Sequence, residues 1–155
     1  MRITAIFLLV VSITAIGFIE SIRLKMRVHE LEVFCDALNS MRRAAAYTAG
    51  DLRQIIYACR DNRFMSRLKT ENDPIESWMN AAKGYFSYAD DAKYALEFIQ
   101  GYGHSDLSGL ISYIEYFEKT ISDKLLEAKQ AYAAKGKLYT ILGLFLGTAA
   151  AILIV

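Results

Sequence analysis

The amino-acid sequence predicts an all-α protein, an antiparallel helical bundle between two terminal transmembrane helices. Two observations support this fold class. Apolar residues recur at alternating spacings of three and four along the central sequence, and no segment alternates apolar and polar residues as a half-buried strand would. Both ends are strongly apolar: residues 3–19 and 138–155 are stretches of 17 and 18 residues without a charge, close to the length with which an α-helix crosses a bilayer.

The charge-free stretches divide the chain into three predicted parts. Residues 1–22 form an N-terminal transmembrane helix, residues 23–137 a cytoplasmic helical bundle and residues 138–155 a C-terminal transmembrane helix. The orientation follows from the basic side chains, because lysine and arginine near a span favour the cytoplasmic side. All but Arg2 of those near the spans lie on the central side, namely Arg23, Lys25, Arg27, Lys129, Lys135 and Lys137. The sequence therefore predicts a multi-pass protein of the cell membrane.

A cleaved signal peptide is the alternative for the N-terminus. Ala15-Ile16-Gly17 fits the small-x-small cleavage rule loosely. Arg23, Lys25 and Arg27 just downstream oppose translocation, which favours an intact span.

Residues 20–49 predict one long amphipathic helix that continues the first span. They contain neither proline nor glycine, and their apolar residues form a single stripe. Gly50 suits the end of this helix, and Asp51 is the predicted N-cap of the next. The two buried faces comprise Leu24, Val28, Leu31, Phe34, Cys35, Leu38, Met41 and Ala45, and then Leu52, Ile55, Ile56 and Cys59.

The middle of the chain predicts shorter helices. A helical turn carries Phe64, Met65 and Leu68, and the polar residues 69–73 predict a loop. Asp73 is the predicted N-cap of a helix with proline at its first position, a Glu76 that returns the capping contact, and an end at Gly84. Its predicted buried residues are Ile75, Trp78, Met79 and Ala82.

Residues 90–100 predict a further helix that presents Tyr94, Phe98 and Ile99. After a turn at residues 101–104, Ser105 is the predicted N-cap of the last helix. Its apolar spacing continues to Tyr132, and the helix then runs into the second span through Gly136.

Nothing in the sequence favours an enzyme. His29 and His104 are predicted as solvated residues, and there is no His-x-x-x-His pair, Gly-rich phosphate loop or nucleophile elbow. Cys35 and Cys59 lack the spacing of a metal or redox pair, which favours two reduced cysteines. The net charge of +1 gives no reason to expect nucleic acid. We therefore expect no catalytic residue, cofactor or metal.

The charges of the central region are unevenly distributed. Residues 20–70 carry 10 basic and 6 acidic side chains, whereas residues 71–137 carry 7 and 11, so the two halves are expected to attract each other. Four arginines, spaced by 7, 3 and 4, would form one cationic stripe on a continuous helix. The stripe is either a docking face for an acidic partner or a solvated face that balances the acidic half. These candidate docking residues are Arg53, Arg60, Arg63 and Arg67.

Small residues in the second span predict close helix packing. Gly143, Gly147 and Ala151 recur every four residues, a pattern that lets two helices approach closely in lipid. Small residues of the first span, Ser12, Ala15 and Gly17, could meet them. Pairing within one chain and pairing between chains both remain open, so a homo-oligomer is possible.

The last third of the chain resembles the stage III sporulation protein AB family of endospore-forming bacteria. The resemblance is carried by Gly103-His104-Ser105-Asp106, Gly136-Lys137-Leu138-Tyr139 and Leu142-Gly143, and the first span adds Gly17-Phe18. It implies a bundle like the cytoplasmic domain of the type II secretion F protein. It also implies a place on the mother-cell side, in the outer forespore membrane, beside a secretion-type ATPase, stage III sporulation protein AA.

The function we expect is a non-enzymatic membrane platform of the channel between mother cell and forespore, which docks this ATPase on its cytoplasmic bundle. The alternative is a two-span membrane adaptor or signalling protein with a different cytoplasmic partner. A small membrane enzyme comes third.

Overall fold

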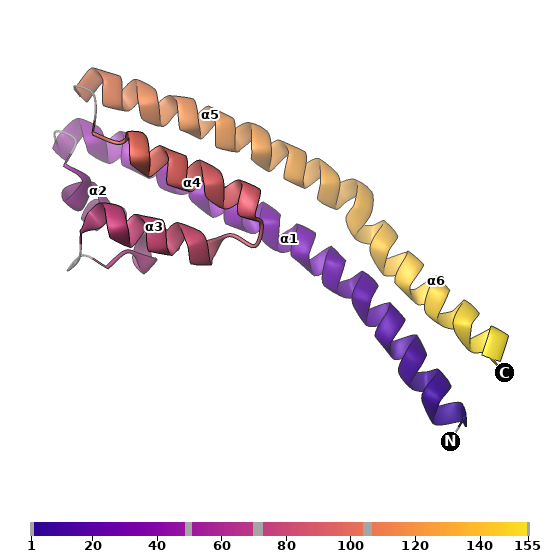
Figure 1. Cartoon of the computed structure of the whole chain (residues 1–155). Coiled ribbons are helices and arrows are strands. Elements are labelled where there is room, and N and C mark those ends of the chain that lie inside the picture. The colour runs from indigo at the N-terminus through magenta and orange to yellow at the C-terminus, as the bar shows by residue number, and fades with distance from the viewer. Residues whose placement is uncertain (1, 49–50, 70–72, 104–106, 155) are drawn as a thin grey trace. The chain divides into compact units, whose positions relative to one another are not determined.

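The protein is all-α, as predicted. The computed structural model describes residues 2–48, 51–69, 73–103 and 107–154, and within these ranges it contains helices and connecting turns but no strand (Figure 1). Among these residues, no helix combines the length and the apolar character that a membrane crossing requires. The two predicted terminal spans are thus not confirmed by the structure.

The chain forms two compact units. We call Met1–Val28 with Glu127–Val155 the terminal pair, and His29–Leu126 the bundle. The charges divide between them. The terminal pair contains seven basic and two acidic side chains, a net charge of +5, whereas the bundle contains 11 and 15, a net charge of −4.

Two long helical stretches begin and end the chain. Helix α1, Arg2–Thr48, is a single α-helix of 47 residues, so the predicted continuity from residue 3 to residue 48 is present. At the other end, α5 (Leu107–Ala131) passes through η2 (Tyr132–Gly136) into α6 (Lys137–Ile154). The segment η2 is a π-helix, a wider turn with i→i+5 hydrogen bonds, and it ends at Gly136.

Four shorter elements follow α1 in the bundle. They are α2 (Leu52–Ala58), the 3₁₀ turn η1 (Met65–Arg67), α3 (Pro74–Tyr85) and α4 (Ala89–Gly101). The Asp51 carboxylate accepts a hydrogen bond from the backbone N–H of Arg53 at 3.1 Å, and Asp73 accepts one from Ile75 at 3.3 Å. Each therefore caps its helix, and Pro74 occupies the first turn of α3. The predicted cap Ser105, Gly50 and His104 lie outside the described residues.

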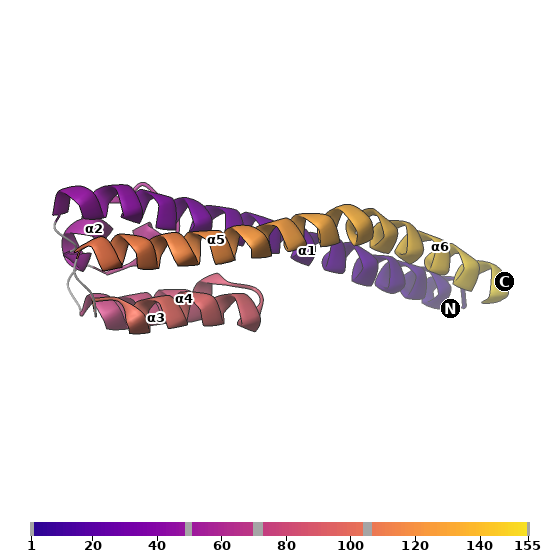
Figure 2. The ribbon, with the colours of Figure 1, turned by 90° about the horizontal axis from the view of Figure 1, so that it is seen from above.

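An aromatic cluster forms the centre of the bundle. Helices α3 and α4 form a hairpin (Figures 1 and 2), and ring contacts join it to α1. The Trp78 side chain is fully buried between Phe34 and Phe64, at ring distances of 6.2 and 5.0 Å, and Phe98, at 5.3 Å. Its indole N–H donates to the Ala95 carbonyl oxygen at 2.8 Å, so the only polar atom of the side chain is satisfied.

Several predicted core positions differ from the structure. Ile75 is 41% exposed, because the first turn of α3 instead turns Ser77 inward, where its hydroxyl accepts the Lys69 N–H at 2.7 Å. Cys35 is only half-buried, whereas Ala37 is fully buried, so the buried stripe of α1 lies slightly to one side of the predicted one. Leu24, Val28, Met79 and Tyr94 are half-buried as well.

Tyr113 joins α5 to the end of α4. Its hydroxyl donates to the carbonyl oxygens of Phe98, at 2.9 Å, and Glu97, at 3.2 Å. A Cβ on Gly101 would collide with this phenol, which explains the glycine at the end of α4. Gly103 then turns the chain with a φ of 90°, a conformation that favours glycine.

The half-buried phenols of Tyr102 and Tyr113 predict a loss of stability at alkaline pH. Burial, with a smaller contribution from the Asp51 carboxylate, raises the pKa of Tyr102 from 10.0 to about 12, and burial also raises the pKa of Tyr113. The unfolded phenols ionise first, so this stabilisation is complete below pH 10 and is lost as the pH rises toward 12. Urea unfolding should therefore give a lower free energy at pH 11 than at pH 9. Tyr102→Phe should reduce that decline, and an equal decline in the variant would contradict this origin.

Candidate partner-docking surface

Three of the candidate arginines lie on an irregular segment fixed to the bundle. We call residues 59–68 the arginine segment. The Asn62 side chain fixes this segment to α1, because its amide N–H donates to the Val33 carbonyl oxygen at 2.9 Å. The side-chain oxygen of Asn62 accepts hydrogen bonds from the backbone N–H groups of Phe64, at 2.9 Å, and Met65, at 3.3 Å. Phe64 and Met65 are fully buried. The exposed arginines of the segment thus project from a backbone that is well anchored.

The four arginines do not share a helix, which corrects the picture of one helical stripe. Helix α2 ends at Ala58, and only Arg53 lies on it. The reason is the Asn62 contact with α1, which fixes the segment in a turn and a short 3₁₀ helix where local spacing predicted helical continuity. All four side chains are nevertheless exposed.

Aromatic rings and one histidine position three of these arginines. The Arg60 guanidinium lies 5.5 Å from the centre of the Tyr57 ring, and that of Arg67 lies 5.1 Å from the centre of the Tyr85 ring. Arg67 also donates to the Gly84 carbonyl oxygen at 3.4 Å, and Arg63 Nη1 lies 3.3 Å from His29 Nε2. A guanidinium stacked on a ring keeps its N–H edge available for a carboxylate, which suits recognition of an acidic surface.

The phenol of Tyr85 lies within the electrostatic field of two of these arginines. Its pKa is raised chiefly by burial and then by Glu30, while Arg63 and Arg67 lower it. The structure therefore brings Arg63 and Arg67 together around one side chain. Glu30 itself is buried on α1 and accepts the Ser87 hydroxyl at 2.6 Å and the Ser87 N–H at 2.8 Å.

Asn62 and Glu30 were not identified as important from the sequence. An asparagine two residues before a buried Phe64-Met65 pair is a weak signal for a side-chain cap of the following turn. The hydrogen bond between Asn62 and Val33 joins residues that are 29 positions apart, so the sequence around Asn62 does not indicate it. The same holds for the contact between Glu30 and Ser87, which are 57 residues apart.

Loss of the Asn62 side chain should loosen this surface. Asn62→Ala removes three hydrogen bonds and leaves part-buried backbone groups unpaired, so we expect the free energy of unfolding to fall by about 1–3 kcal/mol. Asn80→Ala, an exposed position on α3, should change it by no more than about 0.5 kcal/mol. Equal effects of the two substitutions in urea unfolding would argue against the anchoring role.

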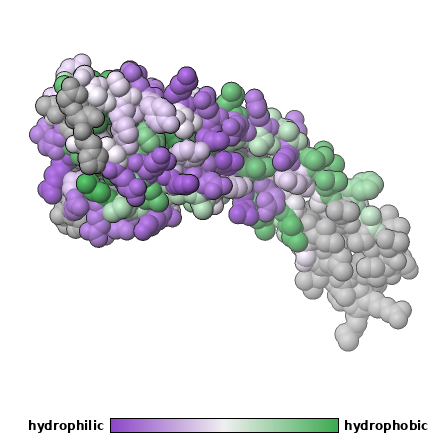
Figure 3. Space-filling view, turned by 45° about the horizontal axis from the view of Figure 1, so that its top comes forward, coloured by the Kyte–Doolittle hydropathy of each residue, from purple (hydrophilic) through white to green (hydrophobic). Residues whose placement is uncertain are grey.

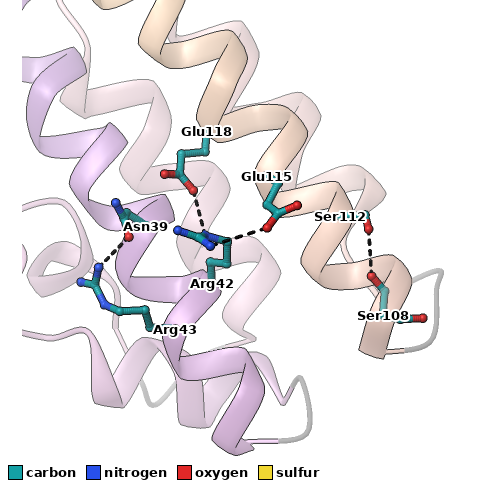
Figure 4. A network of polar contacts seen from close by, with 7 residues as sticks. All are labelled: Asn39, Arg42, Arg43, Ser108, Ser112, Glu115 and Glu118. Atoms are coloured by element: carbon teal, nitrogen blue, oxygen red, sulfur yellow. Dashed lines mark hydrogen bonds and ion pairs between the residues drawn. The ribbon is translucent and has the colours of Figure 1, made fainter.

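A second charged cluster lies between α1 and α5 (Figure 4). The Arg42 guanidinium is 3.1 Å from the Glu118 carboxylate and 3.5 Å from that of Glu115, and Arg43 contacts Asn39 on the same helix. These contacts realise the expected attraction between the basic and acidic halves. The groove beside them has a volume of about 400 Å³ and is lined mainly by charged side chains. The pair is half-exposed, so a contribution of about 1 kcal/mol or less is expected.

The structure also describes the possible metal ligands and the two cysteines. No group of three potential ligands from His, Cys, Asp and Glu gathers in the part of the chain that the structure describes. Cys35 and Cys59 do not form a disulfide. Burial raises the pKa of Cys59, against a smaller opposing effect of Arg43, which disfavours the thiolate.

In the terminal pair, the two ends of the chain pack against each other through small residues. A Cβ added to Gly17 would collide with the Tyr139 carbonyl oxygen and lie 3.1 Å from Gly143 Cα, so α1 and α6 meet backbone to backbone at this point. Gly147 and Ala151 belong to α6, and the burial of both lies outside what the structure describes. Ser12 and Ala15 are exposed.

A comparison with protein families identifies one match. A family model described as stage III sporulation protein AB matches residues 2–155, nearly the whole chain. Neither the curated proteins nor the solved structures contain a match. The chain therefore belongs to the stage III sporulation protein AB family and has a role in sporulation.

Proposed function

We propose that this protein is a non-enzymatic membrane platform of the channel between mother cell and forespore. Its bundle, similar to the cytoplasmic domain of the type II secretion F protein, docks a secretion-type ATPase, stage III sporulation protein AA. The observation that carries the docking proposal is the anchored arginine segment, whose exposed guanidiniums are held on Tyr57 and Tyr85. Pre-ordered arginines bind acidic partners at a lower entropic cost than mobile ones.

The membrane attachment rests on the terminal pair. Its described surface carries many large apolar side chains, which Figure 3 shows as green atoms. Phe145, for example, is 70% exposed. Exposed apolar side chains on these two helices suit contact with lipid. We propose that the terminal pair holds the chain in the outer forespore membrane, with the bundle on the mother-cell side, because basic residues flank both apolar stretches on the side of the bundle.

The contact between Gly17 and Gly143 favours pairing of the two terminal helices within one chain. The remaining exposed apolar side chains leave room for a second copy, so a homo-oligomer in the membrane is compatible with this arrangement. Neither arrangement changes the docking proposal.

Charge reversal tests the docking surface. Arg60→Glu with Arg63→Glu should weaken binding of the ATPase by about tenfold or more, since like charges placed together cost several kcal/mol. Lys93→Glu with Lys119→Glu, two exposed positions on α4 and α5, makes the same change of charge elsewhere on the bundle and should leave binding unchanged. Binding is measured by co-purification and crosslinking from membranes, and circular dichroism checks that each variant folds.

The same experiment distinguishes the platform from the alternative function, a membrane adaptor with a different cytoplasmic partner. Equal binding of the ATPase by both double variants would show that the arginine segment is not part of the interface. A bundle that crosslinks to another cytoplasmic protein and never to the ATPase would favour the membrane adaptor.

A further inference from the structure

We propose that a groove in the terminal pair binds the headgroup of an anionic phospholipid. The groove lies between α1 and the junction of η2 with α6, and it has a volume of about 300 Å³. Its lining residues are Ser21, Tyr132, Gly136, Lys137 and Ile141. This inference rests on the proposed membrane attachment and adds a specific ligand to it.

The π-helix provides space for the groove. Gly136 ends η2 and is buried, and a Cβ at this position would lie 2.8 Å from Cδ2 of the Tyr132 ring and 3.6 Å from the Ser21 hydroxyl. The Tyr132 ring therefore lies directly over a bare backbone, with a side chain of α1 nearby. Any larger residue at 136 would push the ring outward and change the groove.

The lining is polar on one side and apolar on the other. Lys137 supplies an exposed ammonium group and Ser21 a hydroxyl, both suited to a phosphate. Ile141 lies one turn further along α6 and is 63% exposed, and its neighbours Leu138 and Leu144 are exposed as well. A glycerophospholipid has a phosphate next to apolar acyl chains. Its phosphate would lie at Lys137 and Ser21, and its acyl chains would lie along Ile141.

The surrounding charge selects an anionic headgroup over a zwitterionic one. The terminal pair carries seven basic and two acidic side chains, and Lys135 is exposed next to Gly136 of the groove along the sequence. Basic pockets between helices at a membrane surface favour anionic headgroups, and each basic side chain near the surface contributes about a fivefold increase in binding. A zwitterionic lipid, with its own ammonium group, gains little from this field.

Native mass spectrometry tests the groove. The full chain is released from a neutral detergent with added phosphatidylglycerol, phosphatidylcholine or inorganic phosphate. We expect retention of phosphatidylglycerol over phosphatidylcholine, and about a fivefold loss of retention in Lys137→Gln. Lys25→Gln removes the same charge from the terminal pair outside the groove and should have a smaller effect, and Lys93→Gln, on α4 in the bundle, should have none.

Each other outcome overturns the inference. Equal retention of both lipids would exclude headgroup selection, and equal losses in Lys137→Gln and Lys25→Gln would indicate a diffuse charge effect instead of a groove. Full displacement of phosphatidylglycerol by inorganic phosphate would show that the acyl chains contribute nothing. A chain that fractionates with membranes but shows no lipid preference would refute this groove and leave the proposed function intact, whereas a chain absent from membranes would refute the proposed function.

Discussion

Replacing Trp78 with alanine is expected to lower the free energy of unfolding by about 3–5 kcal/mol, the usual cost of truncating a fully buried large aromatic side chain. The side chain is 0% exposed and has ring contacts with Phe34, Phe64 and Phe98. Its removal leaves a cavity that these rings cannot fill without leaving their edge-on and tilted arrangements. Because a whole domain is stable by only about 5–15 kcal/mol, this one change should bring the bundle close to unfolding.

Two controls separate volume from hydrogen bonding at this position. Trp78→Phe keeps most of the ring volume but loses the bond to the Ala95 carbonyl oxygen, so it should cost less than alanine. Tyr57→Ala removes another aromatic side chain, one that is 67% exposed, and should cost little. The measurement is urea unfolding followed by far-ultraviolet circular dichroism. A Trp78→Ala cost no larger than that of Tyr57→Ala would contradict the described core.

Two glycine-to-alanine substitutions are expected to act in opposite directions. Gly17→Ala places a Cβ against the backbone of Tyr139 and Gly143, so the two helices must separate, at a cost of about 1–3 kcal/mol. Gly84→Ala lies on the exposed side of α3, where no atom outside the neighbouring backbone of the helix lies within 4 Å of the new Cβ. It should stabilise the helix by up to about 1 kcal/mol, because alanine is the better helix former.

Thermal unfolding in a neutral detergent, followed by circular dichroism, compares the two variants. The result expected is a lower midpoint for Gly17→Ala and an equal or higher midpoint for Gly84→Ala. If Gly17→Ala left the midpoint unchanged, the close approach of α1 and α6 within one chain would be untenable.

The local features of the fold could be predicted from the sequence, because they depend on neighbouring residues. The spacing of apolar residues is sufficient to locate α1 and α5, and Asp73 with Pro74 is sufficient to locate the start of α3. Trp78 and Phe98 lie on the faces that the sequence assigns to the core. Ile75 was also assigned to the core but is exposed, because the hydrogen bond between Ser77 and Lys69 determines which side of the first turn of α3 faces the bundle.

The candidate site was only partly predictable, because distant residues shape it. The four arginines were identified, but their arrangement depends on the bond between Asn62 and Val33, which no spacing rule describes. The groove at Ser21 and Lys137 also joins positions more than 100 residues apart in sequence. The sequence predicted that the last helix continues through Gly136 into the second span, and nothing in it indicated the π-helix there.

The segment η2 also sets the rotational phase of α6. Each residue of an α-helix advances the side-chain direction by about 100°, so one residue more or less before α6 would turn every following side chain by that angle. The phase present in the structure is the one that places Gly143 opposite Gly17. If the same five residues formed regular α-helix, they would advance the side-chain direction further than the wider π-turn does, and a neighbouring, bulkier residue of α6 would face α1. The winding of this short segment, more than its composition, thus determines which side of the C-terminal helix faces its partner.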